Sequence, residues 1–598
     1  MESFDIEAST EATSQAGLGV APEQGMHRHT CKLLSLSANL AVQTLSGFGS
    51  GLSTFIFVGT LGPLATGGCT LGNMLCNITG YSLVFGMATA LDSLCAQSFG
   101  AKQYLNIGLH TQRAILILTL CSLPCILVWV HAEYLLHHVL FIPSDIAAHA
   151  GLWTRTNSAG LWPLIAVECL KKFMQSRNIV WPAVVTTSVG LVFNICANLY
   201  VLRVRKWGFA GAAWVIPAQN WLHFIVLVSI LLCRKAAVRR ARGSRAAAAA
   251  AAGGMMMTYD KLPDESSHGS SLLSSSTSTS TSSSSTLSIA SPGPGLSAAN
   301  ASADSGADDP ENDWPPLSPA VFRDWPAFLA LGIPGAASLF IEWGSFELAA
   351  AIAGQLGAVG LAAHGVFMST SGLFYMLPLS IAQATTTVAG HIVGEMGAKR
   401  GAAEGGGGGG GEGKGEGKIK GKGEGAVGKT TANNNNNNSG SGSDSDSGSG
   451  SGDGGQAAAR KIILIGIAID TTYGFLAAAV LLFAVRPFWG SIFTGDAATR
   501  RLVYDTMPFM ALYAIVDASK CITLNILRSG GLPGVTVWVN FGVCVLVMVP
   551  LGYYLALVRG MGLAGLWLSM SVSWALATVA FGTVLLNLDL RRLRVIRD

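Results

Sequence analysis

Three acidic residues stand inside long apolar stretches of the sequence. Glu342 and Glu347 lie in the run 326–353, and Asp517 lies in the run 503–526. An ionised side chain at the centre of a lipid bilayer costs on the order of 3 kcal/mol. A carboxylate kept there is therefore neutral, paired or retained for function. Such a group can bind a proton or an organic cation, and two ligands that compete for one carboxylate are thereby coupled.

The spacing of the two glutamates argues against a close pair. On a helix, five positions turn the side chain by about 500°, so Glu342 and Glu347 point about 140° apart. We expect Glu342 to be the main coupling site, with Asp517 or Glu347 supporting it. The indole of Trp343 could add a cation–π contact of ~0.5–2 kcal/mol. The alternative for each carboxylate is a packing role, with a hydrogen bond to a neighbouring helix.

Other polar groups in the apolar runs leave their roles open. Lys520 follows Asp517 by three residues and shares its helix face. It either pairs with Asp517 or extends toward water and leaves Asp517 free. For Asp470 the sequence favours neither a functional nor a structural role. Asn77 begins a glycosylation sequon, but it lies within an apolar run and is a candidate to line an N-terminal cavity.

Two further acidic residues stand near the ends of apolar runs, close to lysines. We expect Lys102, or Lys171 and Lys172, to neutralise Asp92 and Glu168. These acids are therefore predicted to be structural.

The elements that hold these residues are apolar. Of the 598 residues 50% are hydrophobic and 12% charged, whereas soluble proteins carry roughly 25% charge. This excludes an ordinary soluble enzyme, and a net charge of +4 does not indicate a nucleic-acid partner. Twelve stretches are long enough to cross ~30 Å of hydrocarbon as helices. They are 35–60, 71–97, 109–131, 150–174, 180–202, 210–233, 326–353, 359–390, 461–485, 503–526, 535–557 and 563–588.

Low-complexity segments divide the chain. A basic, alanine- and serine-rich stretch and a Gly/Lys/Asn-rich stretch cannot bury enough apolar surface to fold. Lys and Arg gather in loops after even-numbered spans, which places both termini and both segments in the cytoplasm. The predicted organisation is a disordered tail 1–30, a six-helix bundle 31–235, a disordered linker 236–322, a second six-helix bundle 323–590 interrupted by a disordered insertion 398–458, and a basic tail 591–598.

The two halves repeat one another. The motif at 59–62 matches 354–357, the motif at 100–102 matches 397–399, and 208–211 matches 562–565. Six spans per repeat bring both halves into the membrane from the same side. We predict an all-α membrane protein of twelve transmembrane helices in two pseudo-symmetric six-helix bundles around a central cavity, the geometry of alternating access. A static scaffold is the alternative.

Several motifs carry a family resemblance. They are Asn77–Gly80 with Phe85–Gln97 and Gly100–Lys102, Lys172–Gln175 with Trp181 and Pro182, Ile341–Glu347, and Val516–Asp517 with Leu527–Gly531. Together they resemble the eukaryotic MATE (multidrug and toxic compound extrusion) transporters over essentially all twelve spans. The first span holds no Asp or Glu, so the resemblance implies coupling in the C-terminal half. Lys520 and the long insertion depart from the family pattern.

These observations predict a secondary-active antiporter that exports organic cations or other xenobiotics and metabolites in exchange for protons. The alternatives are a lipid or metabolite flippase on the same plan and a non-transporting receptor or scaffold. We expect no enzyme activity, because no HExxH or GxSxG motif lies in the spans. We expect no cofactor or metal, protons rather than sodium as coupling ion, and a monomer in the plasma or vacuolar membrane.

Overall fold

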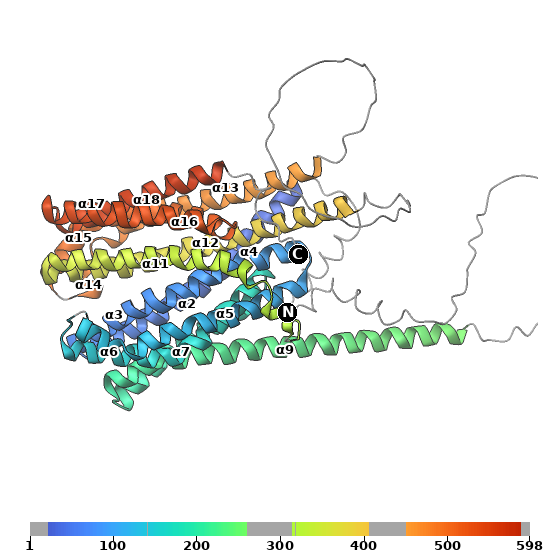
Figure 1. The fold of residues 1–598 in the computed structure, drawn as a ribbon, viewed down its shortest axis with the longest axis horizontal. Coiled ribbons are helices and arrows are strands. Elements are labelled where there is room, and N and C mark those ends of the chain that lie inside the picture. Colours follow the sequence, from blue (N-terminus) through green and yellow to red (C-terminus); the bar gives the residue numbers. More distant parts are fainter. Residues whose placement is uncertain are drawn as a thin grey trace, which may run out of the picture.

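The computed structural model describes residues 22–139, 141–259, 314–316, 318–405, 450–494 and 496–587. These residues form helices and short connections, and no strand occurs among them. Figure 1 shows the N-terminal half, blue to green, beside the C-terminal half, yellow to red.

The N-terminal half contains six membrane-length helical units. Some units combine an α-helix with a π-helical turn, in which backbone hydrogen bonds join residues five positions apart and not four. The label η marks these turns, except that η4 is a 3-10 turn. The elements are α2 (Pro22–Gly59), α3 (Pro63–Cys76), η1 (Asn77–Tyr81), α4 (Ser82–Gly100), α5 (Tyr104–Val130), α6 (Ala132–Tyr134), η2 (Leu135–Val139), α7 (Ser144–Ser176), α8 (Trp181–Leu199), η3 (Tyr200–Val204) and α9 (Gly208–Tyr259).

The C-terminal half contains another six. Its elements are η4 (Pro319–Phe322), α11 (Trp325–Gln355), α12 (Gly357–Gly405), α13 (Gly450–Ala479), η5 (Val480–Val485), α14 (Trp489–Phe493), α15 (Ala497–Ser529), α16 (Pro533–Asn540), η6 (Phe541–Met548), α17 (Val549–Tyr553), η7 (Tyr554–Val558) and α18 (Gly562–Leu586).

The twelve predicted spans all fall on these helices. Among the described residues, eleven helical stretches are long and apolar enough to cross a membrane. The predicted span 150–174 lies on α7, which is long enough but does not meet the same apolar criterion. That helix carries Arg155, Glu168, Lys171 and Lys172, and these charges lower its hydropathy. Within the part of the chain that the structure describes, twelve membrane-length helical units, six in each half, match the predicted plan.

The internal repeat appears in the backbone. Gly62 precedes α3 with φ of 107°, and Gly357 begins α12 with φ of 84°. Gly208 and Gly562 begin the last helix of their halves with φ of 62° and 59°. Only glycine adopts positive φ without strain, so the repeated motifs keep glycine where the chain must turn in the same way twice.

The helices extend past the predicted boundaries of the low-complexity segments. Helix α9 continues beyond residue 235 to Tyr259 through an alanine tract, and alanine is the strongest helix former. Helix α12 reaches Gly405 and α13 begins at Gly450. Residues 260–313 and 406–449, residues 1–21 and the tail 591–598 lie outside the described residues.

The C-terminal end of the predicted linker also differs from the expected disorder. Residues 314–316 and 318–322 are described, and they lie against α5 and α7. Gln112 donates to the carbonyl of Pro315 at 2.8 Å, and the rings of Trp314 and Phe173 lie 5.4 Å apart. Arg113 donates to the carbonyl of Ala320 at 3.2 Å. These contacts dock the segment before it enters α11.

The two halves pack closely at one end. The extended parts of α9, α12 and α13 project from the same end of the molecule, on the right in Figure 1, which we name the linker end. There His391 of α12 donates from Nε2 to the carbonyl of Ser176 on α7 at 2.6 Å. Gln175 of α7 donates to Thr387 of α12 at 3.1 Å. These bonds join the halves where their helices end.

Nearer the middle of the molecule, α4 lies against α11 through glycine. A Cβ placed on Gly86 would lie 2.4 Å from Cα of Ala336, and one on Gly335 would lie 2.4 Å from the carbonyl oxygen of Gly86. No side chain fits at either position. The two backbones therefore touch, and this contact sets the distance between the halves nearly two turns of α11 before Glu342.

Candidate functional site

Glu342 of α11 is paired inside the membrane-spanning part of the molecule. Lys520 of α15 donates its ammonium to Oε1 of Glu342. Lys520 is 0% exposed and Glu342 is 5% exposed. Neither alternative predicted for Lys520 is correct, because it neither pairs with Asp517 nor extends to water. The partner comes from a distant part of the sequence: α15 packs against α12, α13 and α18, and the long side chain of Lys520 reaches across to α11.

A second cation lies on the other side of Glu342. Arg528, near the end of α15, places Nη2 3.8 Å from Oε2 of Glu342 and donates to Oγ of Ser338 at 3.1 Å. Asn540 of α16 donates to the same Ser338 oxygen at 3.0 Å. Ser338 precedes Glu342 by one turn of α11, so these bonds hold Arg528 beside the carboxylate. The role of Arg528 was not predicted from the sequence.

Asp517 lies one turn from Lys520 on α15 and is also buried. It contacts the side chains of Tyr513 and Trp574. The indole Nε1 of Trp574 donates to the hydroxyl of Tyr513 at 3.1 Å, and the ammonium of Lys520 lies 4.2 Å from the centre of the Trp574 ring. Trp574 of α18 therefore touches both the acid and the base.

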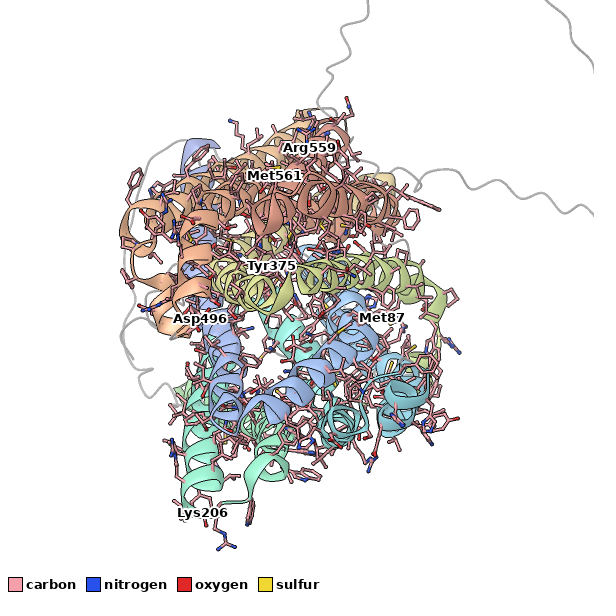
Figure 2. All side chains as sticks on the ribbon, turned by 90° about the vertical axis from the view of Figure 1, so that its left-hand side faces the viewer. Met87, Lys206, Tyr375, Asp496, Arg559 and Met561 are labelled. Carbon is pink, nitrogen blue, oxygen red and sulfur yellow. The ribbon has the colours of Figure 1, made fainter. Side chains whose placement is uncertain are left out.

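A small aromatic pocket adjoins Asp517. Its wall carries Phe374 and Tyr375 from α12, Tyr473 from α13 and Tyr513 from α15, and Asp517 is its one charged lining residue. Figure 2 looks at the molecule from the end opposite the linker end and labels Tyr375 near the middle of the view. The pocket thus combines aromatic faces with a carboxylate in the interior of the C-terminal half.

The other two predicted residues of α11 lie apart from this group. Glu347 is half-buried, and within the described part of the chain it makes no ion pair or side-chain hydrogen bond. The ring of Trp343 lies 6.1 Å from that of Phe85 on α4. Trp343 therefore sits at the contact between the halves. The structure brings Glu342 and Asp517 together around Lys520 and leaves Glu347 outside.

Asp470 of α13 is the least satisfied acid among the described residues. It is fully buried, and neither carboxylate oxygen has a hydrogen-bond partner. Asp470 lies near Asp517 and Cys521, both on α15. Asp470 therefore belongs to the surroundings of the cluster formed by Glu342, Lys520, Arg528 and Asp517, which we name the charge cluster.

The two acids predicted to be structural are neutralised by lysines of α7. Lys172 binds Asp92 of α4 at 2.9 Å, and Lys171 pairs with Glu168 on its own helix. The predicted neutralisation by Lys171 and Lys172 is confirmed. The charge of Arg528 also attracts Asp92, so alternating charges run from the C-terminal half into α4.

A second buried polar group lies in the N-terminal half. Asn194 of α8 donates to Oε1 of Gln219 on α9 at 2.8 Å and to Oγ1 of Thr54 on α2 at 2.9 Å. Asn198 donates to the same Thr54 oxygen at 3.3 Å. The sequence interpretation missed this group, although two asparagines four residues apart in an apolar run were a signal. Asn77 is half-buried in η1, and within the described residues its side chain makes no hydrogen bond with this group.

The described residues contain no group of three or more His, Cys, Asp or Glu side chains that could hold a metal ion. The side chains of the charge cluster are themselves suited to proton binding, ion pairing and cation–aromatic contact.

Comparisons with known proteins agree on one family. The MatE family model matches residues 40–200, 334–402 and 439–554. The chain is 24% identical over 556 residues to Protein DETOXIFICATION 16 of Arabidopsis thaliana, covering 92% of this chain and 87% of that protein. It is 23% identical over 540 residues to Multidrug and toxin extrusion protein 2 of Oryctolagus cuniculus, covering 89% and 67%.

The fold agrees with solved structures. A crystal structure of the eukaryotic MATE transporter AtDTX14 superposes with a TM-score of 0.68 at 20% identity, covering 95% of this chain and 98% of that one. An outward-facing MATE family transporter superposes with a TM-score of 0.62 at 14% identity, covering 92% and 93%. These matches confirm the twelve-helix plan in two bundles.

Proposed function

The chain belongs to the MatE family, and on that premise we propose that it is a secondary-active antiporter that exports organic cations or other xenobiotics and metabolites in exchange for protons. It is an integral multi-pass membrane protein of the multidrug and toxin extrusion type, and its family and fold are those of membrane transporters. What we propose beyond the family is that protons are the coupling ion and that organic cations or other xenobiotics and metabolites are the substrates.

The observation that carries it is the aromatic pocket with Asp517 at its edge. Cations bind over aromatic faces with ~0.5–2 kcal/mol, more when they are shielded from water. A single carboxylate beside four aromatic rings suits an organic cation with an apolar body, but in this state the cavity measures only about 10 Å³, so the cation enters only after the surrounding helices move apart. Such a ligand buries its hydrocarbon against the rings and places its charge near Asp517.

Glu342 supplies the coupling to protons. As an anion, Glu342 balances two cations, Lys520 and Arg528. A proton on Glu342 removes that balance and leaves positive charge one turn from Asp517. Because like charges repel strongly in a low-dielectric interior, the protonated state disfavours a cation in the pocket. Proton uptake and cation binding therefore oppose each other, as antiport requires.

The packing of the two halves supports alternating access. The bonds of His391 and Gln175 close the linker end. The Lys and Arg distribution predicts that this end faces the cytoplasm, in the plasma or vacuolar membrane. In that orientation the described state is closed to the cytoplasm. Export then requires these bonds and the α4–α11 contact to open in the alternate state.

A lipid or metabolite flippase is the second candidate, because Lys520 and Arg528 are buried basic groups that an anionic headgroup would seek. Both, however, already lie beside Glu342. The cluster contains as many acids as bases, and this balance favours the cation exporter.

Flux measurements test the proposal. Purified full-length protein in proteoliposomes should move ethidium, tetraethylammonium or tetraphenylphosphonium when a pH gradient is imposed, and an equal sodium gradient should not replace it. Gradient-driven movement of a fluorescent phospholipid, with no flux of any of the three cations, would favour the flippase. The antiporter would be rejected if no cation flux occurred from protein whose cooperative thermal unfolding shows that it is folded.

A further inference from the structure

Lys520 stands between two carboxylates and has no access to water. Its ammonium is paired with Glu342, and Asp517 lies one turn away on the same helix face. Taking a lysine charge out of water costs several kcal/mol unless a partner compensates it. The ammonium must therefore remain with one of the carboxylates whenever the other is neutralised.

From this arrangement, and resting on the proposed function, we infer that Lys520 is a tethered counter-cation that moves from Glu342 to Asp517 when Glu342 takes up a proton, and there displaces the substrate cation from the aromatic pocket.

The surroundings of Lys520 allow this exchange. Its side chain has four rotatable bonds, and its ammonium lies against the face of Trp574 at 4.2 Å from the ring centre. Trp574 also contacts Asp517. The ammonium can therefore cross from one carboxylate to the other while staying on an aromatic surface. Arg528 cannot make the same movement, because Ser338 holds its guanidinium.

The charge balance explains why proton and substrate exclude each other. Two acids and two bases make the charge cluster neutral when both acids are ionised. Either a proton on Glu342 or a cation beside Asp517 leaves one excess positive charge, and both together leave two. Without the lysine charge, both ligands together leave only one. Lys520 therefore raises the cost of simultaneous binding, and its removal should uncouple the two ligands.

Other ionisable groups face the cluster from each neighbouring helix. They are Asp470 of α13, Tyr375 of α12, Tyr513 and Cys521 of α15, Cys544 of η6 and, beside Arg528, Asp92 of α4. None of them is basic, so none replaces the lysine charge. Within the described residues, Lys520 is the cation that adjoins both Glu342 and Asp517.

Equilibrium binding separates this role from a merely structural one. Full-length protein in nanodiscs is titrated with tetraphenylphosphonium at pH 8 and pH 5.5. For the wild type we expect acidification to weaken binding on the order of tenfold or more, which is about 1.4 kcal/mol or more. Lys520→Met should bind more tightly at pH 5.5 and lose most of this pH dependence. Lys520→Arg, which retains the charge, should keep more of it than Lys520→Met.

The matched control is Lys171→Met. Lys171 is also a lysine of a membrane helix paired with a carboxylate, that of Glu168 on its own helix, but it does not adjoin the pocket. The pH dependence of tetraphenylphosphonium binding to Lys171→Met should equal that of the wild type. If Lys520→Met does not fold, Lys520→Gln, which keeps a polar side chain but no charge, takes its place and should likewise lose most of the pH dependence.

The inference and the proposed function fail in different ways. Absence of proton-driven cation flux in the wild type would reject the antiporter. If the wild type transports cations but Lys520→Met keeps the wild-type pH dependence of binding, only the role of Lys520 is rejected.

Discussion

Lys520 and Glu342 are 178 positions apart in the chain and form an ion pair that water does not reach. Such a pair is asymmetric in its energetics. Removing one partner leaves an uncompensated buried charge and typically costs 3–5 kcal/mol, whereas removing both is often nearly neutral.

A double-mutant cycle on this pair should show that asymmetry. We expect Glu342→Gln to destabilise the protein by about 3 kcal/mol, because Lys520 and Arg528 lose their shared anion. The double variant Glu342→Gln with Lys520→Met should recover most of the loss. Thermal unfolding in detergent measures the stability of the single variants and of the double variant. Additive losses in the double variant would show that the two side chains do not interact.

Asp517 should matter more to cation binding than Glu347. Asp517→Asn removes the one carboxylate of the aromatic pocket, and we expect the affinity for tetraphenylphosphonium to fall on the order of tenfold. Glu347→Gln should cost much less, because Glu347 lies outside the charge cluster. Isothermal titration of both variants decides between them, and a larger loss in Glu347→Gln would contradict the assignment of the pocket.

The glycine contact between α4 and α11 should be sensitive to a single methyl group. Gly86→Ala places a Cβ 2.4 Å from Cα of Ala336, so the two halves must separate. We expect lower transport and greater accessibility of linker-end cysteines introduced by mutation. Gly344→Ala is the control on α11, since a Cβ placed there meets nothing within 4 Å. Equal behaviour of the two variants would argue against a tight interface.

Asp470 should tolerate the loss of its charge. Neither of its oxygens has a partner, so Asp470→Asn removes no ion pair, and we expect stability to be unchanged or to rise by about 1 kcal/mol. Asp92→Asn is the comparison, because it breaks the bond to Lys172 and should destabilise. The thermal unfolding midpoints of the two variants, measured at the same pH, give this comparison. A loss for Asp470→Asn as large as that for Asp92→Asn would reveal a partner for Asp470.

Much of the architecture could be predicted from local patterns. Hydrocarbon thickness sets the length of an apolar span, so the twelve stretches were visible without a fold. The repeated glycines marked two halves, and Gly62 and Gly357 both adopt positive φ. Buried carboxylates in apolar runs drew attention to Glu342 and Asp517 before any geometry was known.

The partners of those carboxylates depended on tertiary structure. Helical periodicity relates residues within a turn or two, so it placed Asp517 and Lys520 on one face and suggested that they pair. It contains no information on which helix packs opposite that face. In the folded protein Lys520 of α15 pairs with Glu342 of α11, and Arg528 of α15 lies beside the same carboxylate. Trp574 of α18 packs against Lys520. The sequence alone determined which charges enter the membrane, whereas the packing of distant helices decided which of them meet.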